Sequence, residues 1–336
     1  MCSSDLGRSA SIFTIHNLQH QGIFDRGVLE YAGISMREFR QDSCESMGML
    51  NMLKGGLYNA TKITTVSPTY AKEIRTSEYG CGLDGVLRFR AADLIGILNG
   101  IDVKEWNPAS DKLIPANYDV SSPDGKAVCK AALQERMGLK NDPKIPVFGV
   151  VSRLYDQKGL DLLARIAQPL VDNMSIQIAV LGSGEPWLEG AFKSLTAANP
   201  GKIGSYIGYD NELSHLIEAG SDFFLMPSRF EPCGLNQMYS MRYGTLPIVR
   251  STGGLADTVS QYVEGTGQGD GFLFDSATCD ALYNTIGWAC STWYDRPSDI
   301  LSLRRNAMNK DFSWEVSAKS YEQVYKWAIE SRTAAF

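Results

Sequence analysis

The sequence has 336 residues, of which 44% are hydrophobic and 21% charged, with a net charge of −6. This length suits two globular domains at ~150 residues each, and the acidic balance disfavours a nucleic-acid-binding surface, which needs clustered basic residues. No segment approaches the ~20 apolar residues that cross a bilayer, and the seven cysteines include no C-x-x-C pair. A cytoplasmic protein that binds neither nucleic acid nor membrane is therefore expected.

The first half of the chain begins with residues 1–10, which lack the apolar core and cleavage site of a signal peptide. We expect them to be a non-native leader. Ile12–His16 has the pattern of an interior strand, yet no earlier strand precedes it, and a buried strand needs neighbours on both sides. The first domain, residues 11–140, is therefore expected to be incomplete. Its other predicted elements are strands at Ile63–Val66 and Leu94–Leu98 and a helix near Pro68–Ile74.

The second half alternates apolar runs with amphipathic stretches, the pattern of βαβ units and a parallel sheet. It is predicted to form a Rossmann-like domain over residues 141–312, after a proline-containing loop or crossover at Asn107–Lys126. Residues 313–336 are predicted to be a helix that crosses back to the first domain. The predicted strands are Ile145–Leu154, Ile176–Leu181, Asp222–Pro227, Leu246–Arg250 and Gly271–Phe274. The predicted helices are Leu160–Val171, Glu212–Ala219, Gln237–Tyr243, Leu255–Val263, Ala281–Trp293 and Val316–Glu330.

The stretch Phe230–Gln237, F-E-P-C-G-L-N-Q, joins a predicted buried strand to a predicted helix. Ligands of open α/β sheets bind at the carboxyl ends of the strands, and a helix N-terminus offers free N–H groups to an anion. Glu231 is therefore placed to hold sugar hydroxyls, and the amides near Gly234 to hold a phosphate. A tight turn without chemistry would give a similar pattern.

A second candidate loop, S-R-L-Y-D-Q-K-G, follows the strongest predicted strand. Arg153 and Lys158 lie on either side of it, so both cations can converge at one sheet edge. Two fixed cations neutralise a diphosphate leaving group without a metal. The alternative is a pair of solvated loop charges.

Other polar or aromatic groups also follow predicted strands. Gly182-Ser183-Gly184 is a weak match to a dinucleotide fingerprint, because Trp187 stands in place of the third glycine; close approach to a ligand or a tight turn remains open. Tyr209 is placed beside a nucleotide base or, as the alternative, at the start of the next helix. His16 and Asn99 follow strands of the first domain, where a structural histidine and an Asn-Gly turn are the alternatives.

Several motifs are absent from the sequence. It contains no D-x-D pair for a metal, no G-x-x-x-x-G-K-[ST] loop and no G-x-S-x-G elbow. These absences argue against a metal-dependent nucleotide-sugar site, a P-loop NTPase and an α/β-hydrolase, and the fingerprint mismatch argues against a nicotinamide enzyme.

Taken together, the motifs resemble the bacterial and plant glycogen/starch synthases over nearly the whole chain. The matching segments, in order, are Thr14–Gly22, Thr65–Ala71, Tyr79–Gly85, Leu98–Asp102, Ser152–Gly159, Phe230–Leu235 and Ser251–Val259. The resemblance implies an α/β fold of two facing Rossmann-like domains of the GT-B type, with the first domain incomplete. It also implies transfer of glucose from ADP-glucose to the non-reducing end of an α-1,4-glucan, with retained configuration and no cofactor or metal.

The resemblance assigns roles to individual residues. Arg153 and Lys158 grip the donor diphosphate and Glu231 contacts the donor glucose, while His16 binds this sugar from the first domain. The remaining donor-binding candidates are Asn99, Tyr209 on adenine, and Cys233, Gly234 and Leu235 around the phosphate.

Two features depart from the family pattern. The K-x-G-G-L loop of the family's first strand does not precede Ser11, and Lys54-Gly55-Gly56-Leu57 lies in a helical context instead. Asn236 stands where relatives often carry Thr or an aliphatic residue. The chain is therefore expected to be an amino-terminally truncated form, inactive alone. The alternatives are another retaining nucleotide-sugar glycosyltransferase and a non-catalytic glucan- or nucleotide-binding derivative.

Overall fold

A computed structural model describes residues 9–334, which divide into two compact units. Unit 1 consists of the described residues of Met1–Gly100 and Trp314–Phe336, and unit 2 of Ile101–Ser313. The boundary predicted at residues 140/141 therefore needs correction. Helix α6 (Gly125–Arg136) belongs to unit 2, because it packs along α9 (Asn211–Gly220). Residues 1–8, most of the predicted leader, lie outside the described residues.

Unit 1 contains a parallel sheet in the order β1-β5-β6 and an antiparallel sheet in the order β2-β4-β3. The C-terminal helix α14 (Trp314–Thr333) groups with this unit, and Ser317 Oγ donates a hydrogen bond of 2.7 Å to Leu98 O. The strands are β1 (Ile12–Ile15), β2 (Ile23–Phe24), β3 (Glu45–Ser46), β4 (Met49–Asn51), β5 (Lys62–Thr65) and β6 (Leu94–Gly96). The other helices are α2 (Val28–Tyr31), α3 (Met52–Asn59), α4 (Pro68–Glu73) and α5 (Asp84–Phe89).

The Lys54-Gly55-Gly56-Leu57 segment lies on α3, so its predicted helical context is confirmed. A Cβ on Gly56 would lie 2.5 Å from Cε2 of Phe13, a residue of β1. Here the glycine lets the helix approach the sheet closely. The segment is a packing feature of unit 1.

Unit 2 contains six parallel strands in the order β12-β11-β10-β7-β8-β9. The strands are β7 (Val147–Val151), β8 (Gln177–Gly182), β9 (Ile203–Ile207), β10 (Phe223–Met226), β11 (Leu246–Arg250) and β12 (Phe272–Phe274). All were predicted except β9, one of the two edge strands, whose sequence I-G-S-Y-I is only partly buried. This order is the doubly wound arrangement of dinucleotide-binding folds, in which the strand order reverses at a switch point. Here the switch point lies between β7 and β10.

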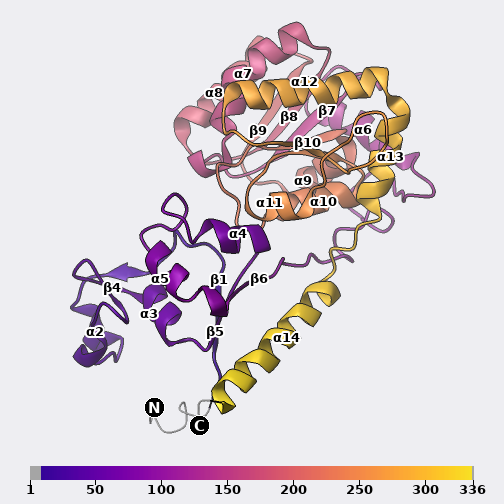
Figure 1. Cartoon of the computed structure of the whole chain (residues 1–336). Helices are drawn as coiled ribbons and strands as arrows, with labels where there is room; N and C mark the ends of the chain where they lie inside the picture. The colour runs from indigo at the N-terminus through magenta and orange to yellow at the C-terminus, as the bar shows by residue number, and fades with distance from the viewer. Residues whose placement is uncertain (1–8, 335–336) are drawn as a thin grey trace. The chain divides into compact units, whose positions relative to one another are not determined.

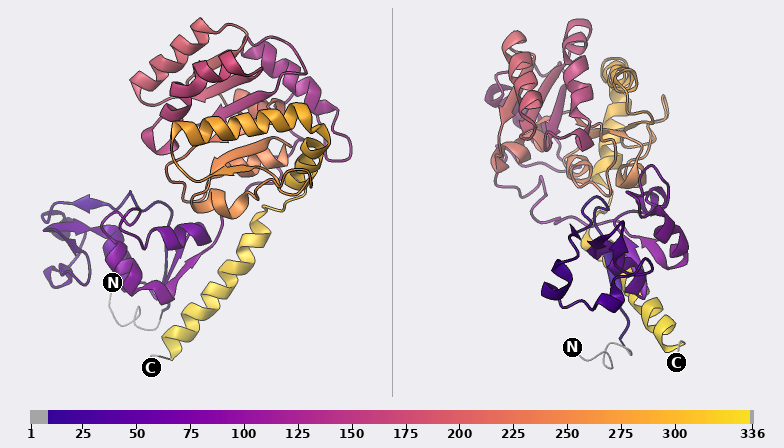
Figure 2. Two further views of the ribbon diagram at one scale, coloured as in Figure 1. Left: turned by 45° about the horizontal axis from the view of Figure 1, so that its top comes forward. Right: turned by 90° about the vertical axis from the view of Figure 1, so that its left-hand side faces the viewer.

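Helices cover both faces of this sheet (Figures 1 and 2). On one face α7 (Leu160–Asn173) packs against α8 (Pro186–Ala198) and α12 (Cys279–Asp295). On the other face α9 packs against α6 and α10 (Asn236–Arg242), with α11 (Gly253–Thr258) beside α10. Helix α13 (Pro297–Met308) contacts both α10 and α12. Among the described residues, no helix is long and apolar enough to cross a membrane.

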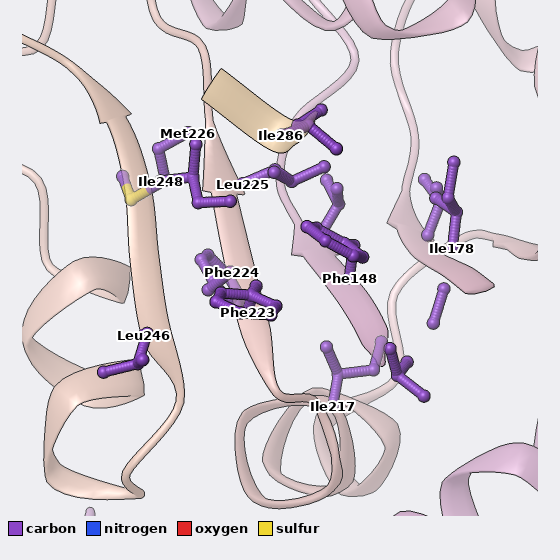
Figure 3. Close-up of a cluster of buried hydrophobic side chains, with 14 of the residues drawn as sticks. Phe148, Ile178, Ile217, Phe223, Phe224, Leu225, Met226, Leu246, Ile248 and Ile286 are labelled. Carbon is purple, nitrogen blue, oxygen red and sulfur yellow. The ribbon is translucent and has the colours of Figure 1, made fainter. Parts of the chain in front are cut away.

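The core of unit 2 lies on both sides of its central strands. Every residue of β8 and β10 is buried, as expected for a parallel sheet covered by helices. Figure 3 shows Ile217 of α9 and Ile286 of α12 with the apolar side chains of this sheet. Phe148 stacks on Phe223 with 4.9 Å between ring centres. Each such side chain stabilises the fold by about 1.5–3 kcal/mol, and this rigid sheet positions the loops at its carboxyl edge.

Candidate active site

The switch point brings together the two loops that the sequence singles out. The loop after β7 contains a short 3₁₀ helix, Asp156–Lys158, and the loop after β10 contains Glu231. Because β7 and β10 are neighbours in a parallel sheet, both loops leave the same edge. The two motifs therefore lie at one edge of the sheet.

Lys158 and Glu231 form an ion pair, with 2.6 Å between Nζ and Oε2. Their side chains are 19% and 7% exposed, so both are largely shielded from water. Ser228 Oγ donates a second hydrogen bond of 3.1 Å to the same carboxylate oxygen. Sequence reasoning assigned no role to Ser228, although it lies three residues before Glu231. The arrangement fixes a carboxylate and an ammonium group at one point of the sheet edge.

The two loops also hold each other through their backbones. Gly159 has a φ of +65°, and a Cβ there would lie 2.0 Å from Pro227 O. The Arg229 N–H donates a hydrogen bond of 2.9 Å to Gln157 O. Glycine is required here because both the conformation and the space exclude a side chain.

A bidentate ion pair adds to this support. The guanidinium of Arg229 donates to both carboxylate oxygens of Asp161, at 2.7 and 2.8 Å. This hydrogen bonding lowers the pKa of Asp161 and raises that of Arg229. Asp161 lies in the first turn of α7, so the pair fastens the loop after β10 to the helix after β7. This pair was not predicted from the sequence, since neither residue belongs to a motif with an assigned role.

A third loop, after β11, packs against the backbone of the Glu231 loop. Cβ atoms on Gly253 and Gly254 would each lie 2.0 Å from a carbonyl oxygen, those of Glu231 and Cys233 respectively. The Gly254 N–H donates to Glu231 O at 3.1 Å. In the sequence, the signal for this close approach was the pair Gly253-Gly254 after a predicted strand. The pair had contributed only to the family resemblance.

The predicted phosphate-binding segment, Cys233–Leu235, lies in the same loop just after Glu231. Gly234 has a φ of +72°, and Gln237 Nε2 donates to the carbonyl oxygens of Cys233 and Gly234, both at 3.1 Å. Helix α10 then begins at Asn236 and is seven residues long. Cys233 is buried, whereas Leu235 is 36% exposed. Among these three candidates, Leu235 is the most accessible to a ligand.

Asn236, the family departure, has a structural partner. Its Nδ2 donates a hydrogen bond of 2.9 Å to Val151 O at the end of β7. The side chain therefore links α10 to the strand that carries the Lys158 loop.

Arg153 and Tyr209 are both exposed, and each follows a strand of the same sheet. The exposed guanidinium of Arg153 lies 5.8 Å from the centre of the Tyr155 ring. Tyr209 follows β9 and is 87% exposed, and the side chain that caps α9 is Asp210, which accepts from the Leu213 N–H at 2.9 Å. The alternative of Tyr209 as the helix cap is therefore wrong. Convergence of Arg153 with Lys158 stays a prediction.

The glycine turn after β8 packs against the loop after β7. A Cβ on Gly182 would lie 2.0 Å from Ser152 O, and one on Gly184 would lie 2.4 Å from Leu154 O. This close approach between loops accounts for both glycines.

The His16 loop of unit 1 is held by two neighbouring motifs. His16 directly follows β1 and is exposed. The Leu18 N–H donates to Tyr70 Oη at 3.1 Å, and burial raises the pKa of Tyr70 to about 12, so this hydroxyl stays neutral. Gln21 Nε2 donates to Cys81 O at 2.9 Å. Two other segments of the family resemblance, Thr65–Ala71 and Tyr79–Gly85, thus position the loop that contains His16.

Asn99 lies in unit 1 after β6 and is half-buried. The next residue, Gly100, has no room for a side chain, because a Cβ would lie 2.6 Å from the backbone of Trp314. Strand β6 ends at Gly96, two residues before the predicted end, so Asn99 lies three residues beyond the strand; its role toward a sugar stays a prediction. Among residues 9–334, no group of three or more His, Cys, Asp or Glu side chains could hold a metal ion.

The doubly wound sheet, with its cation–carboxylate pair at the switch point, defines a class: α/β proteins that bind their ligand at the sheet's carboxyl edge. Comparisons with known proteins narrow this class. The family model "Starch synthase catalytic domain" matches residues 3–89, and "Glycosyl transferases group 1" matches residues 133–300. The chain belongs to the glycogen synthase family of glycosyltransferases and has the GT-B fold.

Particular relatives extend this match. The chain is 51% identical to glycogen synthase 1 of Geobacter sulfurreducens over 327 residues, which cover 97% of this chain and 65% of that protein. It is 46% identical to the glycogen synthase of Treponema denticola, covering 99% and 68%. Among solved structures, the catalytic domain of starch synthase IV from Arabidopsis thaliana, bound to ADP and acarbose, matches with a TM-score of 0.89 and 35% identity. That match covers 95% of this chain and 67% of the other. The chain thus spans about 65% of the length of the first relatives.

Proposed function

We propose that this chain carries the donor-binding part of an ADP-glucose-dependent glucosyltransferase that extends an α-1,4-glucan with retention of configuration. The observation that carries the proposal is the Lys158–Glu231 pair at the switch point of unit 2. The identity to glycogen synthases and the likeness to a starch synthase bound to ADP support the same donor.

The electrostatics of the pair suit a nucleotide-sugar. Lys158 is a compact cation that can turn from Glu231 to a donor phosphate, and it would stabilise the charge that develops as ADP departs. Arg153, exposed on the same loop, would hold the outer phosphate oxygens. Backbone amides of Gly234 and Leu235 would complete the diphosphate site, with Tyr209 stacked on the adenine.

Glu231 is proposed to position the donor glucose through its hydroxyl groups. Departure of ADP would leave an oxocarbenium-like sugar, which the 4-hydroxyl of the acceptor attacks on the same face while its proton passes to a phosphate oxygen of the departing ADP. A positioning role fits better than a covalent one, because Ser228 holds one carboxylate oxygen of Glu231 and no partner carboxylate is assigned for a double displacement. His16 and Asn99 would contribute from unit 1, and a cytoplasmic location belongs to the same proposal.

The test uses the gene with its natural upstream region. Purified protein is given glycogen and either ADP-glucose or UDP-glucose, and incorporation of glucose into glucan is measured. We expect ADP-glucose to be the better donor, and the proposal fails if neither donor extends the glucan. Lys158→Ala and Glu231→Ala should each lower turnover by about 10-fold or more, the worth of one hydrogen bond to a charged group.

A further inference from the structure

Helix α10 follows the Glu231 loop and is too short to be stable alone. Its first residue, Asn236, is hydrogen-bonded to Val151 at the end of β7, as described above. Its last turn is held by a different part of the chain, the segment Asp102–Tyr118 at the start of unit 2. Part of this segment was predicted to be a surface loop or interdomain crossover.

The Trp106 ring lies between two other rings. It stacks on Tyr239 of α10 with 3.9 Å between ring centres and 10° between planes. On its other side it stacks on His215 of α9, with 4.0 Å and 11°. Arg242 Nε, at the end of α10, donates a hydrogen bond of 2.9 Å to Trp106 O. One residue of the segment thus contacts α10 through both its ring and its backbone.

Asp111 and Tyr118 hold Tyr243, the residue that directly follows α10. Tyr243 Oη donates to Asp111 Oδ2 at 2.6 Å, and Tyr118 Oη donates to Tyr243 O at 2.8 Å. The same Asp111 oxygen lies 2.8 Å from His215 Nδ1. All four side chains are at least nine-tenths buried, so these bonds are shielded from water. We call Trp106, Asp111 and Tyr118 the crossover clasp.

We propose that the crossover clasp positions α10 and, through it, the Glu231–Leu235 loop for donor binding, with Trp106 as the main positioning residue. The inference rests on the proposed function, since it assigns the clasp a role in nucleotide affinity. The mechanical connection is short: the N–H groups of Met238 and Tyr239 both donate to Leu235 O, at 2.9 and 3.0 Å. Loss of the Tyr239 stack therefore acts on the turn that carries the phosphate-binding residues.

The test compares ADP affinity by calorimetry for the 336-residue chain and its variants. Trp106→Leu should weaken ADP binding about three- to tenfold, the range that aromatic pair energies correspond to. Trp106→Phe should restore most of the affinity, because it keeps an aromatic ring in the stack. The matched control is Trp327→Leu. Trp327 lies on α14 in unit 1 and is 42% exposed, so this variant should bind ADP with wild-type affinity.

A second readout separates this positioning role from general destabilisation. In Trp106→Leu, hydrogen exchange should accelerate at the amides of Met238 and Tyr239 and stay unchanged in β8. If Trp106→Leu does not fold, Tyr239→Leu against Tyr239→Phe provides the same comparison from the α10 side.

The outcomes are distinguishable. Wild-type ADP affinity in a folded Trp106→Leu or Tyr239→Leu variant, or faster exchange throughout unit 2, would overturn the clasp's role. No ADP binding by the wild-type chain would count against the proposed function instead, and faster exchange confined to α10 would then still support the clasp.

Discussion

Removing one partner of the Lys158–Glu231 pair should cost more stability than the loss of an exposed ion pair. Exposed pairs contribute ~0–1 kcal/mol, whereas removing one partner of a buried pair costs ~3–5 kcal/mol. Lys158 is 19% exposed and Glu231 keeps the Ser228 hydrogen bond, so the cost should fall below that range. We expect Lys158→Met to lower the free energy of unfolding of unit 2 by about 2–3 kcal/mol.

A double-mutant cycle isolates the pair. Lys158→Met, Glu231→Gln and the double variant are unfolded in urea at pH 7 and followed by tryptophan fluorescence. The coupling energy should be about 1.5–3 kcal/mol, the worth of a hydrogen bond between charged groups. Lys193→Met, at an exposed position of α8, is the matched control and should change stability by less than about 0.5 kcal/mol. A coupling energy below about 0.5 kcal/mol would refute the description of the pair as shielded.

Three further predictions concern the loops around the pair. Gly253→Ala should destabilise unit 2 by at least about 1–2 kcal/mol, since a Cβ there meets a carbonyl oxygen at 2.0 Å and φ is +44°. The control Gly190→Ala, at a position in open space on α8, should stabilise unit 2 by about 0.5–1 kcal/mol. Equal melting temperatures for the two variants would contradict the packing argument. Tyr209→Ala should weaken ADP binding about fivefold to a hundredfold, by loss of base stacking. The melting temperature should stay unchanged, because the ring is 87% exposed. Unchanged ADP affinity in calorimetry would show that Tyr209 does not belong to the site. Asp161→Asn should lower the urea midpoint at pH 7, and the difference from wild type should shrink as the pH falls below about 3.8. The reason is that Arg229 lowers the pKa of Asp161, and the stability this gives is present above the unfolded pKa and lost on protonation. A difference in midpoint that persists unchanged at acid pH would contradict this.

The central strands of unit 2 could be predicted from the sequence, because continuous apolar runs such as Phe223–Met226 have few alternatives to a buried parallel strand. The same reasoning placed Lys158 and Glu231 each in a loop that follows a predicted strand. The edge strand β9 was not predicted, since Gly204, Ser205 and partial exposure weaken its apolar pattern. Helix α6 was also not predicted, because buried lysines interrupt its apolar face.

The supporting contacts of the site could not be predicted, because they depend on which loops meet in space. Nothing local to Arg229 indicates that its guanidinium reaches Asp161, 68 residues earlier. Likewise, the stack of Trp106 on Tyr239 joins segments separated by most of a domain. Periodicity and motif spacing describe neighbours along the chain, whereas these contacts follow from the sheet order.

The most direct test of the proposed donor site is calorimetric titration of the 336-residue chain with ADP, repeated with Lys158→Met and with Lys193→Met. We predict saturable binding of one ADP per chain, weakened about 10-fold or more by Lys158→Met, the worth of one charged hydrogen bond, and unchanged by Lys193→Met. Absence of ADP binding at millimolar concentration, or equal affinity of the Lys158→Met variant and the wild type, would contradict the assignment of this sheet edge as the donor site.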